Sequence, residues 1–460
     1  EEWRWADMAA LKAAAETARR DVGIDPAGLF LDIEGPRLLF VDGRFEPAHS
    51  RPGPVQVTQQ LATTDHPLGS LADGEGWSLH LGKEHAATAI QIVHIGTGGE
   101  SHVPARLMLA EDAVASVVET YAGSGWANRL TTLCLERGAR LMRSVRLLQD
   151  AGFVSLREEA EVGEAASLVS VFLGAGGMGS RIDGALLVNG KGGFAEMGGA
   201  LLTSGSQKQE AAVAVRHENV EGTSRQLWRA VAADKSAASL AARVEVARGA
   251  QQTDGEQSLR GLLLQRSATV NLKPELEIFA DDVKCAHGAT VGELDRMALF
   301  YLQSRGIDEG RAKALLTRAF VADALARIGE DVVREAFAAA GPRAMTVAAD
   351  TRPLDLLADF PAIPAGWHYL DTAATSQKPQ PVLDAIARAY GETYATVHRG
   401  VYQRSADITL AYEAARRRVA QFLGGAENEI VFVRGATEGI NLVAQCWAGT
   451  QLKAGDRILL

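Results

Sequence analysis

A cysteine and a histidine lie two residues apart in the stretch DDVKCAHGATVGELD, at the end of an extended region and just before a helical pattern. Thiolate and imidazole are common ligands of zinc and iron. No further Cys-x-x-Cys or His-x3-His pair in the chain would complete a zinc site around Cys285 and His287. Two interpretations stay open: a packed thiol beside a satisfied core histidine, or a two-ligand site that a partner subunit completes.

The residues around these ligands also have purely structural interpretations. Thr290 and Glu293 have the spacing of a capping box, so part of the stretch would then simply begin a helix. The other two cysteines, Cys134 and Cys446, lie in apolar surroundings, which is typical of structural thiols.

Two glycine-rich segments have the spacing of nucleotide- or phosphate-binding loops. GAGGMG at residues 174–179 fits G-x-G-x-x-G, but a strand-like stretch follows where a dinucleotide site requires a helix. Tight turns in a stacked β structure explain this segment more simply. In VRGATEGIN, a strand ends at Val433, a glycine turns the chain, and a helix begins near Thr437. The free N–H groups of this helix would suit a phosphate, or Thr437 and Glu438 merely cap it.

The composition is that of a globular protein, with 47% hydrophobic and 23% charged residues over 460 positions. This length predicts about three domains. A net charge of −10 without a long basic run argues against a nucleic-acid partner. Three distant cysteines form no disulfide framework, so we expect a reducing compartment and a cytoplasmic location. No apolar run approaches the length of a membrane span, and no signal peptide is evident.

The elements that must position these residues change in type along the chain. An alanine-rich helix is expected over residues 1–22, followed by mixed structure with a turn at DGRF. From about residue 90 to residue 282, short apolar runs alternate with polar residues and glycine is frequent. This texture predicts a sandwich, a barrel or a solenoid of short strands. The clearest run places on one face Ala268, Val270, Leu272, Leu276, Ile278 and Ala280.

Helical periodicity begins at Asp295, a suitable N-cap for a helix that ends at Gly306. The following helix has an apolar stripe at i, i+4 spacing, formed by Leu316, Phe320, Ala324 and Ile328. The alanine-rich stretch AGPRAMTVAADTRPLD is interpreted as a linker. Beyond it the pattern is α/β: a helix ended by Gly424, a short buried strand EIVFV, a turn with another helix, and a last strand DRILL.

The stretch 246–307 closely resembles the SufB/SufD family, whose members are scaffold proteins of the SUF system of iron–sulfur cluster assembly. The segments AQQTD, KPELEI, ADDVKCAHGATVG and FYLQSRGI carry this resemblance, and EEWR and HENVEGTSRQ agree with it. The resemblance extends over residues 1–340 and points to the SufD branch. It implies a right-handed parallel β-helix between small helical regions, which accounts for the short strands and frequent glycine turns.

The same resemblance implies partners and a site. A SufB-like subunit would pair with the β-helix edge to edge, and the ATPase SufC would dock on the C-terminal helices. His287 would face a cysteine of the SufB-like subunit where a transient, shared iron–sulfur cluster forms, and Cys285 matches the neighbouring family cysteine. The expected regions are an N-terminal mixed region, the β-helix, the SufC-docking helices, a linker and a second domain, at residues 1–89, 90–290, 291–340, 341–366 and 367–460.

The last of these regions resembles the SufS-type cysteine desulfurases, pyridoxal-phosphate enzymes of the class V aminotransferase (fold type I) architecture. WHYLDTAATSQKPQPVLDAI, YATVHRGVYQRSA and EIVFVRGATEGINLVA carry this resemblance. It places Thr437 on the cofactor-phosphate loop, with Ala436 at a position where the family has threonine. His398 falls on the active-site loop and Ala373 on the substrate side. The lysine that holds the cofactor and the persulfide cysteine lie further along in the family, so no catalytic nucleophile is assigned.

The sequence therefore predicts a SufD-like scaffold joined to the N-terminal part of a desulfurase. If complete, that domain would mobilise sulfur from cysteine with pyridoxal phosphate and pass it to a partner such as SufE or SufU. A genuine fusion, a readthrough or assembly artefact near Met345, and a fragment of a longer chain stay open, because the chain begins with Glu1 and stops at DRILL. The alternative is a bifunctional pyridoxal-phosphate desulfurase with an accessory scaffold domain.

Overall fold

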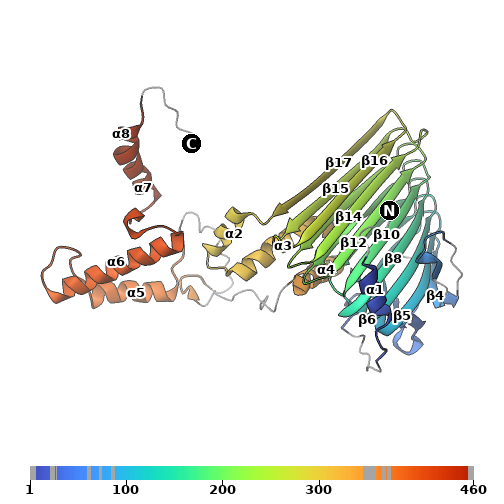
Figure 1. The fold of residues 1–460 in the computed structure, drawn as a ribbon, viewed down its shortest axis with the longest axis horizontal. Coiled ribbons are helices and arrows are strands. Elements are labelled where there is room, and N and C mark those ends of the chain that lie inside the picture. The colour runs from blue at the N-terminus through green and yellow to red at the C-terminus, as the bar shows by residue number, and fades with distance from the viewer. Residues whose placement is uncertain are drawn as a thin grey trace. The chain divides into compact units, whose positions relative to one another are not determined.

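The structure, a computed structural model, describes residues 7–20, 26, 28–59, 64–71, 75–83, 89–345, 359–364, 369 and 375–453. The chain divides into two compact units, Glu1–Thr351 and Arg352–Leu460, and each is described by itself. Strands dominate the described part of the first unit and helices that of the second (Figure 1). In the ranges that the structure describes, no helix is both long and apolar enough to cross a membrane.

The first unit contains a succession of strands framed by short helices. Its helices are α1 (Met8–Ala15), α2 (Arg296–Gln303), α3 (Glu309–Leu325) and α4 (Asp331–Met345). Its strands are β1 (Arg37–Val41), β2 (Arg44–Phe45), β3 (Gln56–Gln59), β4 (Glu75–Leu81), β5 (Ala89–Leu109), β6 (Val114–Leu135), β7 (Arg140–Leu147), β8 (Ala151–Val162), β9 (Ser167–Gly174), β10 (Gly179–Val188), β11 (Phe194–Thr203), β12 (Lys208–His217), β13 (Thr223–Ala232), β14 (Ala237–Val246), β15 (Thr253–Leu263), β16 (Thr269–Ile278) and β17 (Val283–Glu293).

The strands from β5 onward wind into a parallel β-helix with two sheets. From β7 on, each strand pairs in parallel with the strand two positions later, so odd-numbered and even-numbered strands form separate ladders. The two halves of β6 pair with β7 and β8 and so belong to both sheets. One coil takes 27 residues from Arg140 to its partner Ser167 and 32 from Ala237 to its partner Thr269. The predicted parallel β-helix is confirmed.

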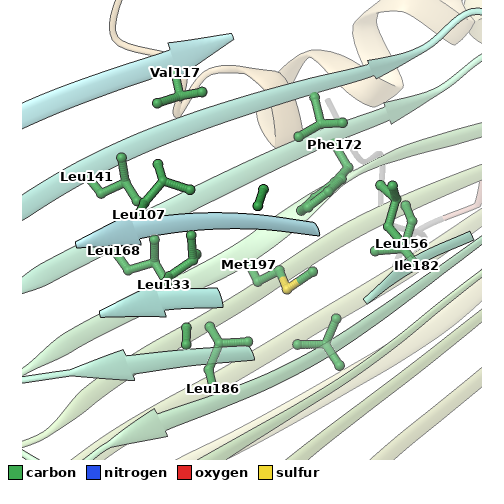
Figure 2. Close-up of a cluster of buried hydrophobic side chains, with 14 of the residues drawn as sticks. Leu107, Val117, Leu133, Leu141, Leu156, Leu168, Phe172, Ile182, Leu186 and Met197 are labelled. Atoms are coloured by element: carbon green, nitrogen blue, oxygen red, sulfur yellow. The ribbon is translucent and has the colours of Figure 1, made fainter. Parts of the chain in front are cut away.

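Alternating side chains of both sheets fill the interior of the β-helix. The core includes large aliphatic residues from successive coils, among them Leu107, Leu133, Leu156, Leu168 and Ile182 (Figure 2). Burial of each such side chain contributes about 1.5–3 kcal/mol. The predicted one-face run in β16 is confirmed by its register, because its members pair with buried residues of β14. The pairs are Val270–Ala238, Leu272–Leu240, Leu276–Val244 and Ile278–Val246.

Glycines make the tight turns that the coils require. In DGRF, Asp42 and Gly43 have φ of 48° and 81° and close the β1–β2 hairpin, as a type I′ turn does. GAGGMG links β9 directly to β10, so a strand follows it and the dinucleotide interpretation is wrong. A Cβ on Gly176 would lie 2.5 Å from the Gln149 carbonyl oxygen, which explains why this turn excludes larger residues.

The two ends of the β-helix differ. At the N-terminal end, β1 and β4 pair with β5, and β2 and β3 add antiparallel strands. At the other end, β16 pairs with β14 and β17 pairs with β15, and no described strand pairs with their outer edges (Figure 1). Pro274 fits this position, because proline is tolerated in edge strands. We call the free edges of β16 and β17 the open edge.

Short helices cover the outer faces of the two sheets. Leu11 and Ala14 of α1 pack on Trp126 and Phe153 of the even-numbered sheet. The predicted helix over residues 1–22 is shorter in the described residues, and Glu16 is its C-cap. The helices α3 and α4 pack on the odd-numbered sheet through a cluster that includes Val321, Leu325, Ile328, Val333 and Phe337.

Two ion pairs hold α3 on the odd-numbered sheet. The sheet supplies the arginine in one pair and the glutamate in the other. Arg229 of β13 donates through Nε to Asp323 Oδ1 at 3.0 Å, and Arg327, just after α3, donates through Nε to Glu196 of β11 at 2.9 Å. Of the predicted stripe, Ala324 is buried on α3, Phe320 packs against the same cluster, and Ile328 is buried just beyond the end of α3. The odd-numbered sheet of the same chain therefore covers much of this stripe.

The sequence located the start of α2 correctly. Asp295 caps it, because its Oδ1 accepts the backbone N–H of Met297 at 2.8 Å, and Gly306 has φ of 81° beyond its end. The capping-box interpretation is wrong, since Thr290 and Glu293 belong to β17. The helix α4 continues to Met345, into the stretch that was interpreted as a linker.

The second unit, in its described residues, contains α5 (Gln380–Gly391), α6 (Gln403–Leu423), a short 3-10 helix (Glu427–Glu429), α7 (Ala436–Val443), a π-helical turn (Ala444–Ala448) and α8 (Gly449–Gln451). Gly424 ends α6 with φ of 74°, as predicted. The prediction of a buried strand at EIVFV is wrong: Val431, Phe432 and Val433 are in no strand and are exposed. Residues 375–453 provide no second strand to satisfy its backbone groups. The expected strand DRILL lies outside the described residues.

Candidate functional site at the open edge of the β-helix

The register of β17 places Cys285 and His287 on the last coil of the β-helix. Cys285 pairs with Gly255 of β15, and His287 pairs with Gln257. Gly255 and Gln257 are buried, whereas Glu256 between them is exposed. Cys285 and His287 therefore continue an interior row of side chains, but no described coil covers them.

The two side chains have different surroundings. His287 is exposed, and Cys285 is half-buried against an apolar cluster of Val244, Val246 and Ala280. Burial raises the pKa of the Cys285 thiol, so this cysteine favours the protonated form at neutral pH. His287 is thus no core histidine, and the packing interpretation holds only for the cysteine. A metal ion or a cation from outside would be needed to favour the thiolate.

Cys285 and His287 do not form a complete metal site. Among the described residues, no group of three or more histidine, cysteine, aspartate or glutamate side chains is placed to hold a metal ion. Structural zinc sites take four protein ligands. Two ligands at an exposed edge leave most of a coordination shell open to ligands from another chain.

The open edge also exposes apolar side chains. Ile278, Phe279 and Val291 are 40%, 59% and 45% exposed. Beside β17, a groove of about 350 Å³ runs between the odd-numbered sheet and the helices, lined in part by Leu262, Val291, Leu294, Leu316 and Phe320. Natural proteins usually protect edge strands with charges, bulges or covering segments. Lys273, Pro274, Glu275 and Glu277 protect β16, whereas β17 has no Asp, Glu, Lys or Arg between Lys284 and Glu293 and is suited to another protein.

In the second unit, Thr437 lies exposed in the first turn of α7, as predicted, next to Ala436. The nearby Glu438 carboxylate accepts the backbone N–H of Arg434 at 2.7 Å and its guanidinium Nε at 3.2 Å. Hydrogen bonds from Arg434 lower the pKa of Glu438. The N-cap of α7 is Gly435, and α7 has no side-chain capping hydrogen bond, so the predicted cap by Thr437 is not formed. The Glu438 carboxylate instead binds Arg434 in the loop before α7, at the end of the helix where a phosphate would bind.

His398 lies on the segment before α6 with φ of 64°, and its Nε2 is 2.8 Å from Glu413 Oε1. Ala373 is outside the described residues. The sequence from residue 367 onward contains two lysines, Lys378 and Lys453, and neither matches the family's cofactor lysine. Because Thr437 and His398 are both exposed, the described residues do not by themselves form a site that fits pyridoxal phosphate.

Sequence reasoning missed a buried polar network inside the β-helix. Arg143 donates through Nε to Glu119 at 2.9 Å and forms an ion pair with Glu158, and Tyr121 donates its hydroxyl to Glu119 at 2.8 Å. These side chains are fully buried. A period-two pattern with charged residues normally indicates a solvent-facing row, so the sequence carried no signal that this row faces inward.

The fold is a parallel β-helix with an open edge, and comparisons with known proteins show which families it is similar to. Residues 104–320 match the family described as SUF system FeS cluster assembly, SufBD core domain, and residues 368–460 match aminotransferase class-V. The chain is 29% identical over 330 residues to the iron–sulfur cluster assembly protein SufD of Escherichia coli K12, which covers 64% of this chain and 76% of that protein.

The desulfurase resemblance is also borne out. The chain is 54% identical over 93 residues to a cysteine desulfurase of Cronobacter sakazakii and 50% identical over 93 residues to one of Klebsiella pneumoniae strain 342. These matches cover 20% of this chain and 23% of each desulfurase, so the chain spans about a quarter of their length. The chain is therefore similar to SufD of the SUF system in its first unit and to cysteine desulfurases in its second, which is the pair of resemblances that the sequence predicted.

Proposed function

We propose that the first unit acts as the SufD-like subunit of a SUF assembly complex and that its open edge pairs with a SufB-like subunit. His287 would then supply one ligand to the iron–sulfur cluster assembled between the two chains. The observation that carries this proposal is the unpaired strand β17, which presents His287 exposed on the last coil.

The backbone of the open edge supports pairing with another β-helix. Along β16 and β17, the N–H and C=O groups of the outer edges have no strand partner among the described residues. Addition of a strand from another chain satisfies such groups and gives affinity through main-chain hydrogen bonds. Exposed Ile278, Phe279 and Val291 would be covered in the same step, which adds the hydrophobic contribution.

The side chains at this edge support a shared cluster site. An imidazole is a suitable iron ligand, and Cys285 lies two residues away on the same face. The isolated chain should bind iron poorly, because its two side chains leave the remaining positions to water. Thiolate and carboxylate ligands from the partner would complete the shell around the cluster, which is the cargo of this system.

The ATPase SufC is proposed to dock on α2 rather than on the stripe of α3. Met297, Phe300 and Tyr301 of α2 are 72%, 46% and 54% exposed, whereas Ala324 and Ile328 are buried on the sheet. An exposed cluster of large apolar side chains is typical of a protein-binding surface.

The second unit is proposed to contribute to sulfur supply when it is part of a complete desulfurase domain. Support comes from 54% identity over 93 residues to a cysteine desulfurase. Such a domain would use pyridoxal phosphate and pass sulfur to a SufE- or SufU-like partner. Because the described residues form no cofactor site, we derive no catalytic step for this chain.

The decisive experiment substitutes His287 in the full chain and reconstitutes the cluster with a SufB-like subunit and SufC. His287→Ala should leave folding and heterodimer formation nearly intact, because the side chain is exposed. Cluster absorbance should fall about 10-fold or more, since outer-shell groups alone often cost 10–100-fold. His80→Ala is the matched control, because His80 is an exposed histidine near the opposite end of the β-helix. Wild-type cluster yield in His287→Ala would overturn the proposed role of His287.

The same reconstitution separates packing from ligation at Cys285. Cys285→Ser should lower the cluster yield less than His287→Ala does if the thiol only packs against Val244 and Val246. An equal loss would instead identify the thiol as a ligand of the cluster.

A further inference from the structure

One row of interior side chains leads directly to His287. Gln226 of β13 pairs with Gln257 of β15, and Gln257 pairs with His287 of β17. Neighbouring strands lie about 4.8 Å apart, so three polar side chains follow one another along the axis of the β-helix. Gln226 and Gln257 are each 1% exposed, and His287 ends the row at the open edge.

The orientation of the Gln257 amide is fixed by two acceptors. Its Nε2 donates to Gln226 Oε1 at 3.2 Å and to the Glu275 carbonyl oxygen at 3.1 Å. The opposite amide orientation would place Oε1 against two other oxygens and is therefore excluded. Since Nε2 is directed toward Gln226, the carbonyl oxygen is directed away from Gln226 and toward the coil that contains His287.

This carbonyl oxygen is buried and lacks a donor. Within residues 89–345, which the structure describes without a gap, Gln257 Oε1 accepts no hydrogen bond. A buried polar atom without a partner destabilises the folded state, so a donor beside it would be favourable. His287 occupies the paired position on the next strand, and its ring always carries at least one N–H.

We propose that Gln257 is a positioning residue for His287: its Oε1 accepts one ring N–H and thereby fixes the tautomer and the orientation of the imidazole. The second ring nitrogen then keeps its lone pair, directed away from β15 and available to a ligand outside the chain. Histidines that bind metals commonly donate their other N–H to a carbonyl or carboxylate in this way. The hydrogen bond between His287 and Gln257 is inferred from the geometry of the β-helix alone. Its use in cluster binding rests on the proposed function.

Cys285 is the other donor near this oxygen, and it fits less well. It pairs with Gly255, two residues from Gln257 along the strand and so roughly 7 Å away. A thiol is also a weak hydrogen-bond donor. The imidazole N–H is therefore the better partner for Gln257 Oε1.

The first test measures the tautomer of His287 in the full chain labelled with 15N-histidine, at a pH where the ring is neutral. His287→Asn identifies its signals. We expect one tautomer in the wild-type protein, because one nitrogen is held as a donor. A mixture of both tautomers in the wild type would overturn the proposal, and this measurement depends on no variant at position 257.

The second test removes the acceptor with Gln257→Leu, a substitution of similar size. The His287 signals should then change to those of a tautomer mixture. Gln209→Leu is the matched control, because Gln209 is another interior glutamine, 1% exposed and on β12. It should keep the wild-type tautomer. An unchanged His287 tautomer in folded Gln257→Leu would also overturn the proposal.

Cluster reconstitution distinguishes the two hypotheses. If His287 is a ligand, Gln257→Leu should lower the cluster yield about 10-fold, the lower end of the usual cost of an outer-shell loss. A tautomer mixture with wild-type cluster yield in Gln257→Leu would support the hydrogen bond and refute its use in cluster binding, while His287→Ala alone tests whether His287 is a ligand. A single tautomer with normal yield in Gln257→Leu would refute the positioning role of Gln257.

Discussion

Two histidines of the β-helix have opposite environments, which gives them different physical roles. His287 is exposed at the open edge, whereas His217 at the end of β12 is fully buried with its Nε2 2.9 Å from Ser224 Oγ. Burial disfavours the imidazolium and lowers the pKa of His217 to about 4. His217 therefore makes the stability of the fold depend on pH.

Replacing His217 by glutamine should flatten this pH dependence. Between pH of about 6.5, the usual histidine pKa, and about 4, the unfolded state binds a proton that the folded state does not bind. The contribution is fully present above this window and is lost as pH falls through it, by about 3 kcal/mol. Urea unfolding at both ends of the window measures it, and His80→Gln serves as an exposed control. An identical pH dependence in His217→Gln and wild type would contradict this assignment.

At the residue scale, the sequence identified the candidate ligands but not the residue that positions them. Cys285 and His287 were found because thiol and imidazole two residues apart are uncommon and because the surrounding motif resembles a family. Gln257 was missed, because an amide carries no chemical signal of its own. Its importance follows from the pairing of β15 with β17, which a single sequence does not specify.

At the element scale, periodicity identified which face of α3 is apolar but not what covers it. The predicted helix face is confirmed for Phe320 and Ala324, whereas Ile328 lies beyond the end of α3. The odd-numbered sheet covers it, and the pairs Arg229–Asp323 and Glu196–Arg327 fix the docking. EIVFV shows the same limit, because apolar β-branched residues favour a strand only where another strand satisfies the backbone.

Docking of SufC on α2 gives a prediction at this scale. Phe300→Glu should abolish co-purification of SufC with the chain, because a carboxylate would be desolvated in an apolar interface. The β-helix should stay folded, since Phe300 is 46% exposed. Val332→Glu on α4 is the matched control, because Val332 is also 46% exposed on a neighbouring helix. Undiminished co-purification with Phe300→Glu would refute α2 as the docking element.

At the scale of the whole molecule, the two units differ in how much they bury. The β-helix has a continuous interior from β1 to β15. In the described helices of the second unit, α5 buries no side chain and α6 buries Ser405 and Ala420. Large apolar residues such as Tyr390, Leu410 and Trp447 are exposed there, by 72%, 69% and 60%. Within its described residues, this unit therefore presents apolar helix faces without the sheet on which an α/β domain packs them.

The last prediction concerns the cofactor of this second unit. The 460-residue chain should hold no pyridoxal phosphate covalently, because covalent attachment needs a lysine amine in a formed pocket. Lys378 is exposed and donates to the Ser376 carbonyl oxygen at 2.6 Å, and neither it nor Lys453 matches the family's lysine. The measurement is borohydride reduction of the chain purified with the cofactor, followed by mass spectrometry of lysine peptides. A complete class-V desulfurase treated in the same way is the positive control. One reduced adduct per chain on a single lysine would show that this segment forms the cofactor site after all.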